Sequence, residues 1–391
     1  MEVNGNTYTV TAVKSGIFYA KKIVIPATVK QIDFGGVNWG DKELEVAPGN
    51  PVYKVKNNIL YTADGKTVVF SSKQSGTVKI ADGVKTIAGE AFHGSDLTAL
   101  ELPKSLEKIE AGAFENCTKL RRFKVSAKNP YMMEKAGALY TKNGKKLLYA
   151  GVAKGTLMLP KKTTQIAANA FYGNTTVEMV FIQGKMKKLA KKSLAFSRIK
   201  DVTLPDSLQE IEEGAFMYCS KLADVEIPKS VKKIGANAFD GCYELERVVL
   251  PKKLTTLEKE TFRNCYSLRK IALPKSLRTI KAGTFESCGF NQLVIPKYVK
   301  RIGKNALQVT TKKLIFKGKN VPKIAKQNAC QYGKYAGNTD PDFDLGVVRL
   351  DYIDIQYPMQ HGIGKVKVPA ESTGKYKKAL KGKMEYRELE Y

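Results

Sequence analysis

The sequence has little of what catalysis commonly requires. Its 391 residues include two histidines, His93 and His361, and one tryptophan. Neither histidine has a recognisable nucleophile or acid partner nearby in the sequence, so a catalytic triad is not indicated. Gly362-Ile363-Gly364 is too short to form a phosphate-binding loop. A glycan-processing enzyme would need a pair of carboxylates in a cleft, and none is evident. We therefore expect a non-enzymatic protein without a cofactor.

Long hydrophobic runs are also missing. No stretch of 18 apolar residues occurs, so no transmembrane helix is expected. The first residues, Met1-Glu2-Val3-Asn4-Gly5, lack the basic start and apolar core of a signal peptide, and no LPxTG-like sorting sequence follows. Two interpretations stay open. Either an export signal has been trimmed from the chain, or the protein is cytosolic.

Cysteine and histidine groups with metal-ligand spacing are absent too. No Cys-x-x-Cys pair occurs and no histidine lies near a cysteine, so a zinc site is not expected. Asp340, Asp342, Asp344 and Asp351 provide carboxylates at intervals that calcium loops use. However, Gly346 falls at the seventh place instead of the sixth, and the twelfth ligand would be Asp instead of Glu. We interpret the stretch as a solvated acidic turn and expect no metal.

The sequence does contain a strong internal repeat. Cys219, Cys242, Cys265 and Cys288 follow one another at intervals of 23 residues. Ala-Phe or Thr-Phe precedes each cysteine. After each cysteine comes an apolar strand pattern, which ends at a proline where the next copy begins. Self-similarity at a fixed period of this size is typical of a solenoid. No single repeat can bury its own apolar face, so neighbouring repeats must cover it.

Each repeat predicts the same local structure. An alternating segment such as Val225-Glu226-Ile227 predicts a short strand, and the proline after it ends the strand because it has no N–H to donate. The apolar spacing from there through Ala-Phe to Cys predicts one or two helical turns. Ala195-Phe196 is assigned as the Ala-Phe pair of a copy without cysteine. The predicted core is Phe114, Phe216, Phe239, Phe262, Phe285, Cys117, Cys219, Cys242, Cys265 and Cys288.

A longer repeat of 79 residues lies within the N-terminal half. Its two copies begin at Asn50-Pro51 and Asn129-Pro130, and each contains a Leu-Tyr-Thr strand pattern. Asp64-Gly65 and Asn143-Gly144 then predict hairpins with type I′ turns, in which both central residues need φ > 0. We expect two inserted hairpins, at about residues 50–75 and 129–154.

These patterns resemble the BspA-like (treponemal-type) leucine-rich repeat family of bacterial surface proteins, whose motif is I-x-x-x-A-F-x-x-C-x-x-L-x-x-[VI]-x-[IL]-P. The copy from Ile234 to Pro251 carries the full motif, and the resemblance covers roughly residues 20 to 316. We therefore expect an α/β leucine-rich-repeat solenoid of about 13 repeats of 22–23 residues. Each repeat would have one short parallel strand and a short helical turn.

The expected organisation has three parts. Residues 1–20 would form an N-terminal cap, residues 21–316 the solenoid, and residues 317–391 a C-terminal cap with an irregular insertion at about 320–362. Solenoids need such caps because a terminal repeat would otherwise expose its core.

The cysteines allow two interpretations. Cysteines in an exported chain often form disulfides. Here five of the six occupy one column of the repeat, where their Cβ vectors run parallel and suit the disulfide torsion poorly. We therefore expect reduced cysteines stacked in the core, where this residue type is common.

The chain is strongly basic, with 66 Lys and Arg against 37 Asp and Glu, a net charge of +29. Such a charge favours a polyanionic partner. A lysine follows most of the strand-ending prolines, which predicts a row of lysines along one edge of the solenoid. Either lysine is simply a soluble residue for these turns, or the row is a ridge that binds teichoic acid or a sulfated glycan. No aromatic residues interleave the row, so specific nucleic-acid binding is not expected. The row is Lys104, Lys161, Lys229, Lys252, Lys275 and Lys297.

Outward strand positions are the second candidate surface. The apolar side chains among them either form a contact patch or lie beneath a neighbouring loop. The candidate positions are Arg121, Arg122, Met179, Phe181, Arg247, Arg269 and Lys270.

The resemblance implies an adhesin that is secreted or on the cell surface. We expect a monomer that binds host matrix proteins, cells or glycans through the solenoid face. The alternative is a polyanion-binding module that tethers the protein to a cell wall or a sulfated glycan.

Overall fold

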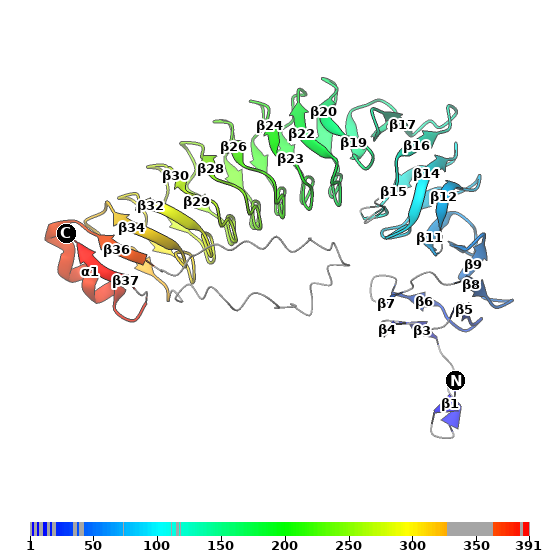
Figure 1. The fold of residues 1–391 in the computed structure, drawn as a ribbon, viewed down its shortest axis with the longest axis horizontal. Helices are drawn as coiled ribbons and strands as arrows, with labels where there is room; N and C mark the ends of the chain where they lie inside the picture. Colours follow the sequence, from blue (N-terminus) through cyan, green and yellow to red (C-terminus); the bar gives the residue numbers. More distant parts are fainter. Residues whose placement is uncertain are drawn as a thin grey trace. The chain divides into compact units, whose positions relative to one another are not determined.

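The fold is a solenoid of parallel strands with about 13 turns, seen in a computed structural model of the chain (Figure 1). It describes residues 2–3, 6–7, 11–13, 16–17, 21–33, 37–38, 43–72, 74–110, 112–114, 117, 119–326, 363–383 and 386–390. The chain divides into two compact units, Met1–Ala153 and Lys154–Tyr391. In the described residues, no helix has the length and apolar character needed to cross a membrane.

Short strands account for most of the regular structure. The first unit contains β1 (Glu2–Val3), β2 (Asn6–Thr7), β3 (Ala12–Val13), β4 (Gly16–Ile17), β5 (Lys22–Ile25), β6 (Gln31–Ile32), β7 (Val37–Asn38), β8 (Glu43–Val46), β9 (Tyr53–Lys56), β10 (Ile59–Thr62), β11 (Thr67–Ser71), β12 (Ser75–Lys79), β13 (Thr86–Ile87), β14 (Asp96–Leu102), β15 (Lys108–Ile109), β16 (Arg122–Val125), β17 (Met132–Lys135), β18 (Ala138–Thr141) and β19 (Lys146–Tyr149). The second unit contains β20 (Gly155–Leu159), β21 (Gln165–Ile166), β22 (Val177–Ile182), β23 (Lys188–Leu189), β24 (Asp201–Thr203), β25 (Glu210–Ile211), β26 (Asp224–Glu226), β27 (Lys233–Ile234), β28 (Arg247–Val249), β29 (Thr256–Leu257), β30 (Lys270–Ile271), β31 (Thr279–Ile280), β32 (Gly289–Ile295), β33 (Arg301–Ile302), β34 (Thr310–Phe316), β35 (Lys323–Ile324), β36 (Ile363–Lys367), the 3₁₀ helix η1 (Ala370–Ser372), α1 (Thr373–Leu380) and β37 (Tyr386–Glu390).

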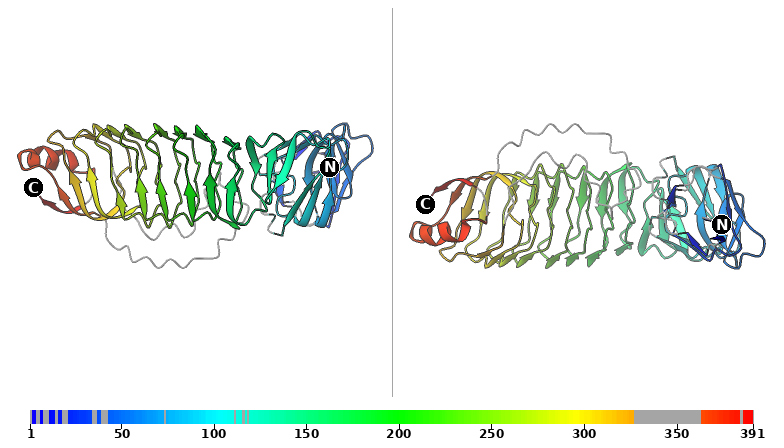
Figure 2. Two further views of the ribbon diagram at one scale, coloured as in Figure 1. Left: turned by 90° about the horizontal axis from the view of Figure 1, so that it is seen from above. Right: turned by 90° about the horizontal axis from the view of Figure 1, so that it is seen from below.

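Each repeat of the second unit contributes one strand to each of two parallel ladders. The first ladder includes β26–β28–β30 and β32–β34–β36–β37, and the second includes β23–β25–β27 and β29–β31–β33–β35. Equivalent residues pair across repeats, as Val225 pairs with Val248 and Val248 with Ile271. Two further views show these strands side by side in successive repeats (Figure 2). The ladders therefore place each column of the repeat on the same column of its neighbour.

The expected helical turn is absent from the described repeats. The segment around Ala-Phe forms non-helical hydrogen-bonded turns, and the helices of the described residues are η1 and α1 near the C-terminus. In each turn, two residues have left-handed backbone conformation, one two positions before the core phenylalanine and one two positions after it. These two residues interrupt any right-handed helix. These pairs are Gly214 and Tyr218, Asn237 and Gly241, Glu260 and Asn264, and Gly283 and Ser287, with φ between 54° and 73°.

The turn directs its hydrogen bonds to the next repeat. The N–H groups of Asn237, Phe239 and Gly241 donate to carbonyls of the following repeat at 3.0, 2.9 and 2.9 Å. The same three positions donate in the repeats before and after it. A helix would have used these N–H groups within its own segment. Here they join neighbouring repeats and satisfy the buried backbone of the turn.

Lys192 is another residue with left-handed backbone conformation in such a turn. Its φ is 52°, and its N–H donates to Glu213 O of the next repeat at 3.0 Å. Lys192→Val should destabilise the protein by about 1–2 kcal/mol, because β-branched residues tolerate this conformation poorly. Lys192→Gly should be neutral or stabilising there. Denaturant unfolding of both variants checks this, and equal effects of Val and Gly would contradict the left-handed conformation.

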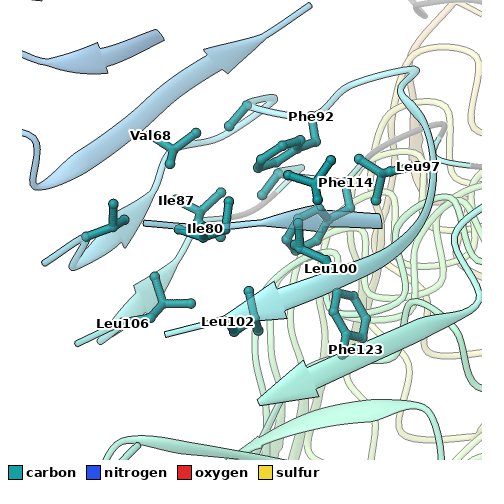
Figure 3. Close-up of a cluster of buried hydrophobic side chains, with 14 of the residues drawn as sticks. Val68, Ile80, Ile87, Phe92, Leu97, Leu100, Leu102, Leu106, Phe114 and Phe123 are labelled. Carbon is teal, nitrogen blue, oxygen red and sulfur yellow. The ribbon is translucent and has the colours of Figure 1, made fainter. Parts of the chain in front are cut away.

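The first unit has its own buried core. Strands and turns between residues 59 and 152 contribute to one apolar cluster, and a close-up shows Ile87, Leu100 and Phe114 among its side chains (Figure 3). The rings of Phe92 and Phe114 lie 5.8 Å apart and stack at 25°. The aromatic column therefore exists in this unit as well.

The two predicted hairpins are confirmed as antiparallel pairs, β10 with β11 and β18 with β19. The predicted turn type is wrong. Gly65 and Gly144 have positive φ, whereas Asp64 and Asn143 do not. The N–H of Gly65 closes a turn on Thr62 O at 2.8 Å, and the register shifts next to the turn in both hairpins. This matches a type I turn followed by a left-handed glycine bulge, which needs positive φ once.

An asparagine attaches each hairpin to the preceding repeat. The Asn129 side chain is 1% exposed. Its Nδ2 donates to the carbonyls of Pro103 and Leu106, both at 2.9 Å, and its Oδ1 accepts from the N–H groups of Tyr131 and Met132 at 2.8 and 2.9 Å. All four hydrogen-bonding positions of the amide are thereby used.

Asn129→Ala should destabilise the protein by about 3 kcal/mol or more, because four backbone groups lose their partner and three of these hydrogen bonds are buried. Asn50 makes the equivalent four bonds in a half-buried position. Asn50→Ala should therefore cost less, since water can replace the amide. Urea unfolding of the two variants compares them, and an equal or smaller cost at Asn129 would contradict this role.

The copy without cysteine has a different register from the predicted one. Leu194, not Phe196, occupies the phenylalanine column, because its N–H donates to Ala215 O at 2.9 Å and its side chain is fully buried. Ser197 occupies the cysteine column, with its hydroxyl 3.5 Å from Cys219 Sγ. The Ala195-Phe196 assignment is therefore wrong by two residues. The dipeptide matched the motif, but the spacing to the strands did not.

The C-terminal elements cover the last described repeat. Tyr376 of α1 is fully buried, and its hydroxyl donates to Gly318 O at 2.8 Å. Ser372 Oγ donates to Lys319 O at 2.8 Å. These contacts close the apolar end of the stack. Residues 327–362, which make up most of the predicted insertion, lie outside the described residues. They include Cys330, His361 and the acidic turn at Asp340–Asp351. Most of the predicted N-terminal cap also lies outside the described residues.

Candidate binding surface

The predicted core columns lie inside the repeats. The rings of Phe216, Phe239, Phe262 and Phe285 are fully buried and stack at centroid distances of 4.9, 5.3 and 5.9 Å. Phe114 is 2% exposed. Since these side chains contact one another, they hold the surface columns in place and are not available to a ligand.

The cysteines of the described residues are free thiols. The sulfhydryls of Cys242, Cys265 and Cys288 donate to the phenylalanine carbonyl of the preceding repeat at 3.1, 3.1 and 3.0 Å. Burial raises the pKa of Cys219 to about 12. A buried thiol with a raised pKa has little thiolate and is a poor nucleophile.

Cys219, Cys242, Cys265 and Cys288 should therefore not react with a thiol reagent in the native protein. Cys117 is half-buried and should react faster than these four. Mass spectrometry after brief alkylation, with and without denaturant, checks the order. Rapid native alkylation at any of the four buried positions would contradict their burial.

Charged side chains on the middle repeats pair across repeats. Glu210 contacts Lys188 and Lys233, each at 2.8 Å, and the two lysines lower the pKa of Glu210. Arg247 Nε donates to Asp224 at 2.9 Å in the same manner. Exposed pairs contribute little stability individually. Their effect on function is to neutralise part of the basic surface.

Among the described residues, one ion pair has a fully buried carboxylate. Asp240 is fully buried and accepts from the Arg263 guanidinium at 2.8 to 3.2 Å. Asn237 and Asn264 donate to the same carboxylate. Burial raises the pKa of Asp240 despite these partners. Because its hydrogen-bonding positions are used within the turn, we assign this group to structure and not to chemistry.

The predicted outward positions differ in what they contact. Arg121, Arg122 and Lys270 are exposed. Arg247 is also exposed but pairs with Asp224, and half-buried Arg269 donates to Gly289 O at 2.9 Å. Arg247 and Arg269 are therefore weaker candidates for contact with a ligand.

Apolar side chains meet on the outward face of β20 and β22. Met158 pairs with Phe181, and Thr156 with Met179. Met158 is 59% exposed, while Met179 and Phe181 are half-buried. Sequence reasoning missed Met158, although its alternation with Leu157 and Leu159 marked it as outward. We call Met158, Met179 and Phe181 the apolar strand patch.

The predicted lysine ridge is exposed throughout. Lys104 belongs to the first unit, and the other five ridge lysines belong to the second. None of the six forms an ion pair within the described chain. Such unpaired ammonium groups remain available to an external anion.

Chemistry other than binding has little support in the described residues. They contain no group of three or more His, Cys, Asp or Glu side chains placed to hold a metal. His93 lies in a repeat turn, where its N–H donates to Glu90 O at 2.9 Å.

Comparison with known proteins places the chain among leucine-rich repeat proteins. The family model described as "BspA type Leucine rich repeat region" matches in six copies over residues 66–136, 140–208 and 187–314. No curated protein matches the chain.

Solved structures similar to the chain include three bacterial proteins. A leucine-rich repeat protein from Eubacterium ventriosum is 18% identical, with 76% of this chain and 79% of that chain covered and a TM-score of 0.48. The pneumococcal vaccine antigen PcpA is 16% identical. The match covers 100% of this chain and 86% of that chain, with a TM-score of 0.43. A leucine rich cell surface protein from Faecalibacterium prausnitzii is 18% identical, with 69% and 89% covered and a TM-score of 0.37.

Proposed function

Because the chain belongs to the BspA type leucine-rich repeat family, we propose that it is a recognition protein, secreted or on the cell surface, which adheres to host matrix proteins, cells or glycans. Families of this kind are typically non-enzymatic and bind proteins. The partner contacts the outward face of the strands as a rigid surface. The protein acts as a monomer.

The apolar strand patch is the observation that supports this proposal best. Monomeric proteins rarely expose large contiguous apolar patches, so a methionine that is 59% exposed next to two half-buried apolar neighbours favours a contact surface. Methionine and aromatic residues are enriched in the buried centre of protein interfaces. A rigid strand face also loses little conformational entropy when it binds.

Met158→Asp should weaken binding to purified matrix proteins by about tenfold, because a central apolar contact is replaced by a desolvated charge. Val24→Asp is the matched control, since Val24 is an exposed strand residue (50%) in the other unit. Binding is measured by surface plasmon resonance at physiological and at about 0.3 M salt, where charge attraction is screened.

The proposal predicts that binding persists at the higher salt and that Met158→Asp alone weakens it. An equal loss in both variants would instead indicate a general charge effect. Unchanged binding in Met158→Asp would remove the apolar strand patch from the proposal.

The second candidate function is a polyanion-binding tether. The exposure of the six ridge lysines, with no carboxylate partner in the described residues, favours it. In this case the ligand is a cell-wall polymer or a sulfated glycan, and its binding falls steeply with salt.

A further inference from the structure

Charge is segregated within the last repeats of the second unit. Five segments connect the two strands of successive repeats: 228–234, 251–257, 274–280, 296–302 and 317–324. We call them the basic corner. They contain no Asp or Glu. They do contain Lys229, Lys232, Lys233, Lys252, Lys253, Lys275, Arg278, Lys297, Lys300, Arg301, Lys317, Lys319 and Lys323.

The acidic residues of these repeats lie on other parts of the repeat. Between residues 228 and 326 they are found in the turns around the core phenylalanines or at the approach to the first strands. Four of them are bound to cations there: Asp240 to Arg263, Glu244 to Lys221, Glu258 to Lys281, and Glu260 to Lys259 and Arg263. The carboxylates therefore neutralise other faces and leave the corner positive.

The cations of the basic corner are mostly unpaired. Within the described residues, Lys233 pairs with Glu210 and Lys319 with Glu371, and no other member of the corner forms an ion pair. All of its lysines and Arg301 are exposed. The lysine ridge contributes four of these residues. A second row adds Lys232, Arg278, Lys300, Arg301 and Lys323, and it is interrupted at 251–257, where Thr255 and Thr256 take the equivalent positions.

Tyr298 lies within this field and is 49% exposed. The Lys297 ammonium lies 4.6 Å and the Arg278 guanidinium 5.0 Å from its ring centroid. The hydrogen bond and charge of Lys297 lower the pKa of Tyr298, and Arg278 adds to the effect. Two cations already occupy the ring, so it is not free to stack on a nucleic-acid base.

The spacing of the rows indicates the form of the ligand. Parallel strands lie about 4.8 Å apart, so each repeat adds one set of cations per step of this length, and the corner extends for about 20 Å. This step is close to the length that one pyranose ring adds to an extended polysaccharide. One sugar residue can therefore face one repeat, with its anionic groups directed at the two rows.

We propose that the basic corner binds a linear sulfated polysaccharide laid along the repeats. The inference rests on the second candidate function, because it names the ligand class and the residues of that binding. Sulfate esters stay ionised at all physiological pH values and match exposed ammonium groups without requiring a pocket. Recognition depends on charge density along the chain, so an unsulfated polysaccharide lacks the necessary contacts.

The test compares two charge-reversed proteins of equal net charge. The corner variant carries Lys252→Glu, Lys275→Glu, Lys297→Glu and Lys300→Glu. The control variant carries Lys154→Glu, Arg198→Glu, Lys312→Glu and Lys375→Glu. The four residues changed in the control are exposed, form no ion pair in the described chain and lie outside the basic corner. Binding to size-defined heparin oligosaccharides is measured by calorimetry at physiological salt, after circular dichroism shows that both variants are folded.

The corner variant should lose about tenfold or more in affinity, and the control variant less than about threefold. Affinity should rise with oligosaccharide length until the ligand spans about 20 Å. Chemically desulfated oligosaccharides should bind at least about tenfold more weakly. The Met158→Asp protein should bind heparin like the wild type, which separates this result from the test of the strand face.

Three outcomes would overturn the proposal. Equal losses in the corner and control variants would mean that total charge decides binding. Undiminished binding of desulfated oligosaccharides would exclude recognition of sulfate. Equal or tighter binding of polyphosphate or oligothymidylate of the same charge would assign the corner to a phosphate polymer.

Discussion

The turn-to-turn backbone hydrogen bonds are the interaction on which the rest of the structure depends. In the turns around Phe216, Phe239, Phe262 and Phe285, three alternate N–H groups donate to the next repeat, because left-handed residues on either side of the phenylalanine orient them along the stack. Within the second unit, these bonds and the two strand ladders together fix the register of each described repeat against its neighbour. A solenoid stabilised only by apolar contacts would lack this register, because the hydrophobic effect is not directional.

Fixed register separates the structural residues from the surface residues. Columns that face inward, such as those of Phe239 and Cys242, are buried and stack on themselves. Columns that face outward can vary without disturbing the core, so they can carry an apolar group at Met158 or a cation at Lys297. A binding surface on such a protein is therefore a property of rows across repeats, and no single residue defines it.

Much of the fold could be predicted because each column repeats its chemistry. The period, the strands and the inward columns follow from apolar spacing, and the hairpins follow from Asp64-Gly65 and Asn143-Gly144 between apolar runs. Apolar spacing does not reveal the turn conformation. Five of its eight left-handed residues are Gly or Asn, which favour φ > 0, but Tyr218, Glu260 and Ser287 are not, so neither column carries a uniform signal. Tertiary hydrogen bonds select that conformation, and they override the apolar spacing that suggested helix. The shift from Phe196 to Leu194 has the same origin.

The surface was predictable to a smaller extent. The lysine ridge follows from position after proline. Its second row and the absence of carboxylates on the same segments become apparent once the two ladders show which residues share an edge. Met158 was overlooked because a methionine in an apolar run resembles core. Its alternation with Leu157 and Leu159, which point inward, distinguishes the two cases.

Native-state amide hydrogen exchange tests the central claim most directly. The account predicts that the N–H groups of Asn237, Glu260 and Gly283 exchange as slowly as those of the neighbouring strands, since all are bonded to the next repeat. Fast exchange at these positions, with protection confined to the strands, would contradict the turn-to-turn hydrogen bonds. The register of the surface rows would then lack its physical basis.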